Sequence, residues 1–551
     1  MTQPPNTAAR RLVETLVMNG IDRVFCVPGE SYLAVLDALA DVTDQIRVIA
    51  CRHEAGAANM AEAYGKLTGK PGVCMVTRGP GATHASIGVH TAHQDSTPMI
   101  LFVGQIASSD RGRGAFQEVD YREVFGGLAK WATEIEQADR TVEIVERAFA
   151  TALQGRMGPV VVALPEDILH HDGGPAPIRP VTPARAALDP AFVAGVGSHL
   201  ARAERPILVL GGSGWTQEAT TAIGDWAERI GLPLALSFRR KDLISNDRPN
   251  YVGDLGLGPS PALIQRAKDA DLIIAVGARL GENPTQGYTL FTRAQTATKL
   301  IHIHPGAEEL GRVWAPLMSA AADVSLAALA LAEIEPGRTW HDQATAGHEA
   351  YDAFSTPVRV TGAVNMSECM VHLGEVLPPT AIVTNGAGNF AAWLHRFHRH
   401  RAMHTQLAPT SGAMGYGFPA AIAAKSVHPD REVICIAGDG DYLMTGQELA
   451  TAVQYGINVV TVIVDNGTYG TIRMHQEGHY PGRVIATDLK NPDFVKYAEA
   501  FGAFAIRCER TEAFPAALAA ARNAGRPAIV HLITSAEDIA PGRTITGLRS
   551  S

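Results

Sequence analysis

The sequence predicts an α/β fold made of three doubly wound parallel-sheet domains. Short apolar runs recur without polar alternation, which is typical of strands buried on both faces. Ala-rich helical stretches lie between many of these runs, and that alternation indicates parallel sheets. One sheet of so many strands would be exceptional, so the chain must divide. The runs cover residues 73–76, 99–103, 160–164, 207–210, 272–276, 300–303, 381–383, 433–437, 459–464 and 528–532.

Two seams divide the chain. Residues 170–190 are dense in Pro and Gly, a composition typical of a linker. Strand-like runs lapse over residues 335–360. The seams predict an N-terminal domain over residues 1–170, a central domain over 190–335 and a C-terminal domain over 360–540.

The composition narrows the class of protein. Net charge is −9 without a long block of one sign, so charge alone attracts neither nucleic acid nor an anionic membrane. No apolar run approaches the ~20 residues of a membrane span, and the polar residues 1–11 lack the apolar segment of a signal peptide. Six scattered cysteines form no CxxC pair, which predicts buried, reduced thiols. We expect a soluble, cytoplasmic protein whose polar residues 542–551 are mobile.

The first domain places a glutamate where a strand gives way to a helix. Arg52-His53-Glu54 follows the apolar run 48–51 and precedes an Ala-rich helical stretch over residues 55–67. A carboxylate in the first turn of a helix answers the helix dipole, which is the simple explanation of Glu54. A functional carboxylate at the end of a buried strand is the alternative.

Three loops of the first domain have the composition of ligand-binding turns. Residues 27–30 and 77–83 each follow an apolar run and contain glycine, which permits close backbone approach to a ligand. Each could equally be a plain tight turn. Phe116 lies in a polar, Gly-containing loop, where it could cap a pocket or anchor the loop.

Two other segments give weaker signals. Residues 211–214 read Gly-Gly-Ser-Gly after an apolar run, which resembles a dinucleotide loop but lacks a full GxGxxG. A His-rich patch shows no zinc-ligand spacing, so we expect a solvated surface there rather than a metal site. The patch comprises His395, His398, His400 and His404.

Residues 438–470 are the most informative stretch. The run 433–437 leads into Gly-Asp-Gly-Asp, and the run 459–464 leads into Asp465-Asn466, with a predicted helix over 444–455 between them. Ligands bind past the carboxyl ends of strands in such sheets. A carboxylate and a carboxamide there can hold Mg²⁺ and leave room for phosphate oxygens. The alternative is two ordinary turns with capping residues. The occurrence of both loops at this separation favours the cation site over that alternative.

Together these segments resemble one family. Gly438-Asp439-Gly440 followed by Asp465-Asn466 looks like the thiamine diphosphate motif, and Arg52-His53-Glu54 resembles the segment with that family's catalytic glutamate. Residues 79–83, 115–118 and 412–417 are similar to acetolactate synthase large subunits. The resemblance spans nearly the whole chain, with the segments in the family's order.

The resemblance implies an architecture. The three domains would be a pyrimidine-binding, a central and a diphosphate-binding domain. Active sites of the family lie between the first domain of one subunit and the third domain of another. At least a homodimer is therefore implied, and a homotetramer is expected.

The resemblance also implies roles for residues. Asp439 and Asn466 would ligate Mg²⁺ through side-chain oxygens, and Thr468 through its carbonyl. Met414 matches the apolar wedge that bends thiamine, and Glu54 would hydrogen-bond the pyrimidine ring as the catalytic residue. The remaining cofactor-binding residues implied are Pro28, Gly388, Asn389, Gly440, Asp441 and Tyr469.

The implied reaction begins with a 2-oxo acid and passes through a carbanion or enamine at carbon 2 of the cofactor. An acetolactate-synthase-like carboligase, a 2-oxo acid decarboxylase or C–C lyase, and a non-catalytic nucleotide-binding or regulatory protein are the three readings. Intact Glu54, Asp439 and Asn466 argue against the third. The candidate substrate-pocket residues are Glu30, Ser31, His84, Phe116, Gln117 and His475.

The sequence departs from the synthases at two positions. Asn283 and His475 stand where synthases carry the Arg and the Trp that select the second 2-oxo acid. Loss of the guanidinium removes bidentate capture of a carboxylate. FAD is a possible cofactor that we do not expect, because residues 302–305, His-Ile-His-Pro, replace the usual acidic residues.

Overall fold

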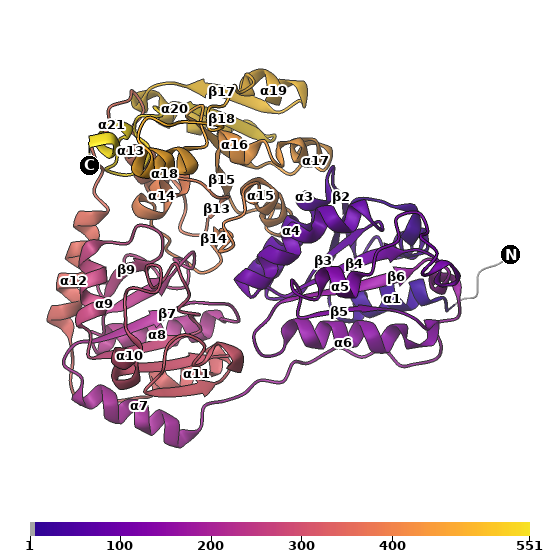
Figure 1. The fold of residues 1–551 in the computed structure, drawn as a ribbon, viewed down its shortest axis with the longest axis horizontal. Helices are drawn as coiled ribbons and strands as arrows, with labels where there is room; N and C mark the ends of the chain where they lie inside the picture. The colour runs from indigo at the N-terminus through magenta and orange to yellow at the C-terminus, as the bar shows by residue number, and fades with distance from the viewer. Residues whose placement is uncertain (1–5, 551) are drawn as a thin grey trace.

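The computed structural model describes residues 6–550, and these form three α/β domains, each with a six-stranded, all-parallel sheet between helices (Figure 1). The predicted fold class is confirmed. Among the described residues, no helix is long and apolar enough to cross a membrane. All six cysteines are buried and free, as predicted.

The N-terminal sheet has the strand order β2-β1-β3-β4-β6-β5. Its strands are β1 (Arg23–Cys26), β2 (Arg47–Ala50), β3 (Gly72–Val76), β4 (Met99–Gln105), β5 (Trp131–Glu134) and β6 (Pro159–Pro165). Its helices are α1 (Ala8–Met18), α2 (Leu33–Ala40), α3 (Glu54–Thr68), α4 (Pro80–Asp95), α5 (Tyr121–Phe125) and α6 (Thr141–Leu153).

The central sheet has the strand order β12-β11-β10-β7-β8-β9. Its strands are β7 (Pro206–Leu210), β8 (Leu234–Ser237), β9 (Tyr251–Leu255), β10 (Leu272–Val276), β11 (Leu300–His304) and β12 (Met318–Ala321). The helices are α7 (Pro190–Arg202), α8 (Gln217–Arg229), α9 (Pro261–Asp269), α10 (Arg293–Lys299), α11 (Val324–Ala332) and α12 (His341–Phe354).

The C-terminal sheet has the strand order β14-β13-β15-β16-β18-β17. Its strands are β13 (Ile382–Asn385), β14 (Gln406–Leu407), β15 (Val433–Gly438), β16 (Val460–Asp465), β17 (Phe504–Cys508) and β18 (Ala528–Ile533). The helices are α13 (Met366–Val376), α14 (Phe390–Phe397), α15 (Gly417–Val427), α16 (Asp439–Tyr442), α17 (Leu449–Gln454), α18 (Gly470–His479), α19 (Phe494–Ala500), α20 (Phe514–Arg522) and α21 (Ile545–Ser550).

The first and third domains share one hydrophobic core. Helix α3 of the N-terminal domain packs against α15 of the C-terminal domain, and buried side chains from both sheets belong to the same cluster (Figure 1). Many of the shared residues are alanines, which let helices approach closely. This packing fixes the start of α3, where Glu54 lies, relative to the C-terminal domain.

Two expectations about helices were wrong in detail. Residues 545–550 form α21 instead of a mobile tail, because Arg549 pairs with the buried carboxylate of Glu477. The predicted helix over 444–455 begins only at residue 449, after a 3₁₀ turn over Gly446–Glu448.

The His-rich patch is not a solvated surface. His398 and His400 are buried beside Lys241 of the central domain, whose ammonium donates to the carbonyl of His398 over 3.1 Å. Burial lowers the pKa of His398 to about 3, and the charge of Lys241 adds to the decrease. The spacing of these histidines in the sequence carries no sign that a second domain covers them.

Candidate active site

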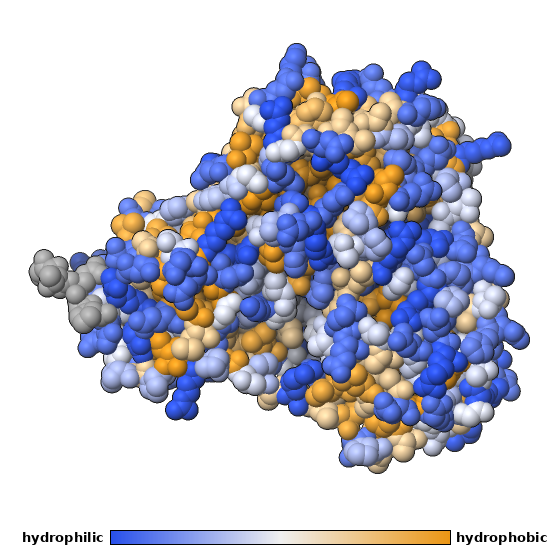
Figure 2. Space-filling model, turned by 180° about the vertical axis from the view of Figure 1, so that it is seen from behind, coloured by the Kyte–Doolittle hydropathy of each residue, from blue (hydrophilic) through white to orange (hydrophobic). Residues whose placement is uncertain are grey.

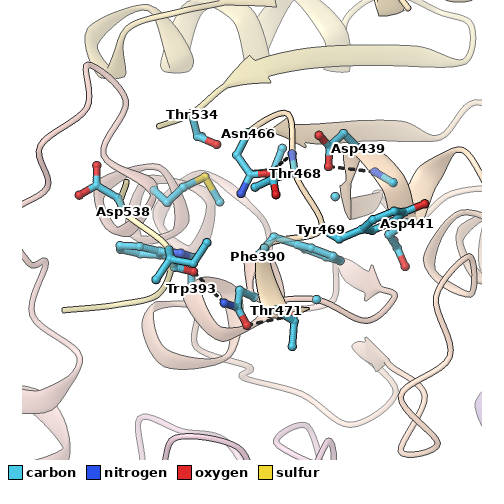
Figure 3. Close-up of a pocket in the computed structure, with 18 of the residues that line it drawn as sticks. Phe390, Trp393, Asp439, Asp441, Asn466, Thr468, Tyr469, Thr471, Thr534 and Asp538 are labelled. Carbon is cyan, nitrogen blue, oxygen red and sulfur yellow. Dashed lines mark hydrogen bonds between the residues drawn. The ribbon is translucent and has the colours of Figure 1, made fainter. Parts of the chain in front are cut away.

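A cavity of about 260 Å³ opens at the carboxyl edge of the C-terminal sheet (Figure 3). The adjacent strands β14, β13, β15 and β16 each lead into a loop that lines it. Asp439 and Asp441 lie toward one end of the cavity, and Asp538 and Trp393 lie toward the other. Strand order therefore gathers loops that are far apart in the sequence, as expected at this edge of a parallel sheet.

Asp439 is held between two loops. One carboxylate oxygen, Oδ1, accepts from the backbone N–H of Gly440 over 2.9 Å, and the other, Oδ2, accepts from that of Gly467 over 3.0 Å. The side chain of Asn491 donates to Asp439 Oδ2 and to Asp465 Oδ1 over 2.7 and 2.8 Å. Burial raises the pKa of Asp439 to about 6, so its ionised form favours a nearby cation.

The loop after β16 supplies the other predicted ligands. Asn466 Oδ1 accepts from the backbone N–H of Thr468 over 3.1 Å, and both residues line the cavity (Figure 3). The ring of Tyr469 lies against Gly440, where a Cβ would come within 2.6 Å of the ring. Only glycine fits there, and the two loops close on each other as a result.

Asp441 joins two further loops. Its Oδ1 accepts from the backbone N–H groups of Ala387 and Gly415, over 3.1 and 2.9 Å. Its Oδ2 is buried without a hydrogen-bond partner among residues 6–550, and burial raises the pKa of this carboxyl to about 7. The side chain therefore braces the loops that carry Gly388 and Met414, and both of these residues line the cavity.

Asn389 also lines the cavity, and its side-chain amide is hydrogen-bonded. The amide donates to the carbonyl of Ile539 over 2.9 Å and accepts from Thr471 over 3.0 Å. Behind it, the ring of Phe390 packs on Gly388 and Gly438, where a Cβ at either glycine would lie 2.8 Å from the ring.

The residues present fit a divalent cation with a diphosphate. The predicted ligands are a carboxylate, a carboxamide and a backbone carbonyl, all hard oxygen donors of the kind Mg²⁺ takes. Glycines at 388, 438 and 440 keep the cavity floor free of side chains. The hydrogen bonds given for Asp439 come from two backbone N–H groups and the neutral amide of Asn491, so its negative charge suits a cation bound there.

Glu54 lies at the carboxyl edge of the N-terminal sheet. It is the first residue of α3, directly after the N-cap His53, as predicted. Its Oε2 lies 2.9 Å from His84 Nδ1, and the rings of His53 and His84 stack at 4.5 Å. The Glu54 side chain is 13% exposed, so it is largely buried but still reached by solvent.

Other predicted residues lie on loops at the same edge of the N-terminal sheet, because β2, β1 and β3 are neighbours in it. Ser31 is buried and hydrogen-bonds Thr77 over 2.9 Å, whereas Pro28 and Glu30 are exposed. Gln117 packs against Gly79, and Phe116 is 75% exposed.

Within one chain the two groups of residues remain separate. Glu54 and its neighbours do not line the cavity that contains Asp439 and Asn466. His475 is exposed on α18 and does not line it either.

Sequence reasoning missed several residues of the site. Phe390, Trp393 and Asn491 contribute to the cavity or its support, and so do Thr534 and Asp538 after β18. Phe390 could have been found, because it directly follows Asn389. Trp393 lies one turn further along the same helix, α14. Asn491, Thr534 and Asp538 depend on how distant loops return to the same edge, which the sequence does not signal.

A second cavity of about 590 Å³ lies between the N-terminal and central domains, which are separated by a hollow in Figure 2. Its lining includes Gly212, Gly277 and His304, at the carboxyl ends of the adjacent strands β7, β10 and β11. The rings of His302 and His304 are buried and hydrogen-bonded to backbone atoms of Ala278 and Gly306.

The three parallel sheets, with candidate site residues at the carboxyl edges of the first and third, define an enzyme that uses thiamine diphosphate, which is also called thiamine pyrophosphate. Three family models match the chain: the N-terminal thiamine pyrophosphate binding domain over residues 6–124, the central domain over 193–331 and the C-terminal binding domain over 386–532. The chain belongs to the thiamine pyrophosphate enzyme family.

Its relatives include acetolactate synthase large subunits. That of Parasynechococcus marenigrum is 32% identical, over 95% of this chain and 87% of the relative. A probable large subunit of Methanocaldococcus jannaschii is 30% identical over 98% and 94%. The isozyme 2 large subunit of Escherichia coli is 29% identical over 97% and 96%. The resemblance stated from the sequence is confirmed.

Proposed function

We propose that the chain is an acetolactate-synthase-like carboligase. It takes a 2-oxo acid, breaks the bond to the carboxylate so that CO₂ leaves, and joins the remaining acyl unit to the carbonyl carbon of a second substrate. Thiamine diphosphate, when bound, accepts the electron pair that CO₂ leaves behind. The observation that carries this proposal is that Asp439 and Asn466 lie at the carboxyl edge of the C-terminal sheet and Glu54 at the carboxyl edge of the N-terminal sheet.

Each residue has a defined task in the proposal. Asp439, Asn466 and the carbonyl of Thr468 hold Mg²⁺, which neutralises the diphosphate. Met414 provides an apolar surface for the thiazolium ring. Glu54 accepts or donates a proton at the pyrimidine nitrogen, and His84, 2.9 Å from the same carboxylate, holds the Glu54 side chain in place.

The proposed active site needs two chains. Glu54 does not line the cavity of its own chain, and among the described residues none from the N-terminal domain lines it. A second copy that brings its N-terminal domain to the cavity would complete the site. We therefore propose a homodimer at least, with a homotetramer as the expected assembly.

Decarboxylation or C–C cleavage without ligation is the second candidate. Asn283 and His475 favour it, since they replace the two side chains that select the second 2-oxo acid in synthases. Water or a proton donor would then end the reaction in place of the second carbonyl compound.

A panel of 2-oxo acids with product identification tests the proposal. The enzyme is incubated with thiamine diphosphate, Mg²⁺ and each acid, alone and in pairs. Carboligation predicts a 2-hydroxy-3-oxo acid or a hydroxyketone, such as acetolactate from pyruvate. Aldehyde alone would favour the second candidate, and no turnover of any 2-oxo acid would contradict both.

A further inference from the structure

Glu448 of the C-terminal domain binds the backbone directly before Glu54. Its Oε1 accepts from the backbone N–H of His53 over 2.9 Å and from that of Arg52 over 3.1 Å. Its Oε2 accepts from Arg52 N–H over 3.2 Å and from the hydroxyl of Thr451 over 2.6 Å. One side chain therefore spans the two domains and reaches the residues that lead into α3.

The contact is close and water is excluded from it. Glu448 is 0% exposed. At Gly56, in the first turn of α3, a Cβ would lie 2.5 Å from Glu448 Oε1, so a side chain at that position would push the carboxylate away. A negative charge at the N-terminus of a helix is also favoured by the helix dipole.

A buried carboxylate needs a structural or functional reason. Burial raises the pKa of Glu448, and the hydrogen bonds from Thr451, Arg52 and His53 oppose the rise. Burying a carboxylate without partners costs free energy of folding. Charge-assisted hydrogen bonds from backbone N–H groups offset that cost. Glu448 does not line the cavity. Its position therefore allows it to act on the active site only through the backbone of residues 52 and 53.

The segment that carries Glu448 also belongs to the cofactor cavity. It begins with Asp439 in α16 and continues to the 3₁₀ turn Gly446–Glu448. Between them, the hydroxyl of Thr445 donates to the carbonyl of Gly415 over 2.7 Å, beside Met414. The segment over residues 439–448 thus includes the predicted metal ligand Asp439, contacts the loop that carries Met414, and contacts the start of α3.

We propose that Glu448 is a positioning residue for Glu54. It fixes the backbone of residues 52 and 53 and thereby the orientation in which the Glu54 carboxylate meets the pyrimidine ring. The inference rests on the proposed role of Glu54. It assigns no contact between Glu448 and substrate or cofactor.

Two variants test the inference on the full-length, cofactor-loaded enzyme. Glu448→Leu removes both acceptor oxygens, and Glu448→Gln keeps the shape and one acceptor oxygen. Glu309→Gln is the matched control, because Glu309 is a buried glutamate of the central domain that is paired with Arg156. Hydrogen exchange of the Arg52 and His53 amides is measured first. We expect faster exchange in both Glu448 variants and no change in the control.

The second measurement is exchange of the C2 hydrogen of bound thiamine diphosphate, which reports on Glu54. We expect a decrease of about 10- to 100-fold in Glu448→Leu, the size of effect that a displaced catalytic group produces. Glu448→Gln should fall between this variant and the unmodified enzyme. Affinity for thiamine diphosphate with Mg²⁺ should change by no more than about threefold, since the diphosphate end is untouched. Undiminished C2 exchange in either variant once its amide protection is lost, or unchanged protection in both, would overturn the inference.

A double variant separates positioning from general damage. In a Glu54→Gln background, Glu448→Gln should slow C2 exchange no further, because the two residues act through one group. Additive losses would overturn the inference. If Glu54→Gln alone is fully active, the proposed role of Glu54 fails. If Glu54→Gln is inactive while the Glu448 variants behave as unmodified enzyme, only the positioning role fails.

Discussion

Two residues restrain Glu54, one at its side chain and one at the backbone before it. His84 contacts the carboxylate itself, and Glu448 contacts the backbone before it. With both contacts in place, the Glu54 side chain is still 13% exposed. A carboxylate that must meet a ring nitrogen benefits from such restraint, because each free rotation would lower the fraction of productive encounters.

Glu54→Gln should separate cofactor binding from cofactor activation. Gln keeps the size of the side chain but cannot exchange a proton at the pyrimidine nitrogen. We expect a decrease of at least about 100-fold in C2 hydrogen exchange, the scale of a lost acid–base group. Thiamine diphosphate with Mg²⁺ should still raise the melting temperature, because a ligand bound only by the folded state stabilises it. Undiminished C2 exchange in this variant would refute the role of Glu54.

Single residues also mark the limit of sequence reasoning. Asp439, Asn466 and Glu54 could be identified because each lies within three residues of the end of an apolar run and belongs to a short motif. Asn491 could not, although it donates to both Asp439 and Asp465. Its loop returns to the site only after α18, and no local pattern announces that return.

At the scale of elements, the predicted strands are those at or near the centres of the sheets. Strands such as β4, β6 and β10 are buried along their whole length and appear in the sequence as apolar runs. Edge strands such as β5, β12 and β17 are half exposed and mix polar with apolar residues, so their runs are interrupted. Burial on both faces therefore helps single-sequence reasoning to detect a strand. It does not suffice, because the short strand β8 is buried along its whole length and is absent from the predicted runs.

The strand β11 leads to a prediction about flavin. Dinucleotide sites commonly place an acidic residue at the end of a neighbouring strand to bind ribose hydroxyls. Here β11 ends in His304, whose ring accepts the backbone N–H of Gly306 over 3.0 Å. We expect purified protein to lack tightly bound flavin and added FAD not to raise its melting temperature. A yellow preparation that absorbs near ~450 nm would contradict this, since flavin is a chromophore the protein only carries.

The buried histidines of residues 395–404 lead us to expect that the folded protein loses stability as the pH falls. The pKa of His398 is about 3 in the folded protein, against an ordinary value of 6.5. As pH falls through 6.5, the unfolded chain takes up a proton and the folded chain does not, so unfolding becomes easier until the pH nears 3. One such group removes about 2 kcal/mol of stability between pH 6.5 and pH 5.

The comparison variant for this effect is His398→Gln. Its melting temperature should change less between pH 7 and pH 5 than that of the unmodified protein. His171→Gln, at an exposed histidine, should leave the pH dependence unchanged. Equal pH dependence in His398→Gln and in the unmodified protein would show that this buried ring does not contribute.

At the scale of the whole molecule, the two halves of the proposed active site are rigidly connected but separate. The core shared by α3 and α15 fixes the N-terminal domain against the C-terminal domain of the same chain. Glu54 consequently cannot swing into its own cavity without opening that core. A symmetric dimer, in which each chain gives Glu54 to the other's cavity, solves this with one interface used twice.

Mixed dimers should reveal this arrangement. Glu54→Gln and Asp439→Asn chains are each expected to be inactive alone. When they are coexpressed with different tags and assort at random, about half of the dimers contain one chain of each kind. In those dimers, the Asp439→Asn chain gives its intact Glu54 to the intact Asp439 cavity of the other chain, and the second site carries both changes. Activity should therefore return to about a quarter of that of the unmodified enzyme, and doubly tag-purified dimers should reach about half. If each Glu54 served its own chain's cavity, every site in every mixed dimer would carry one damaging change, and no activity would return.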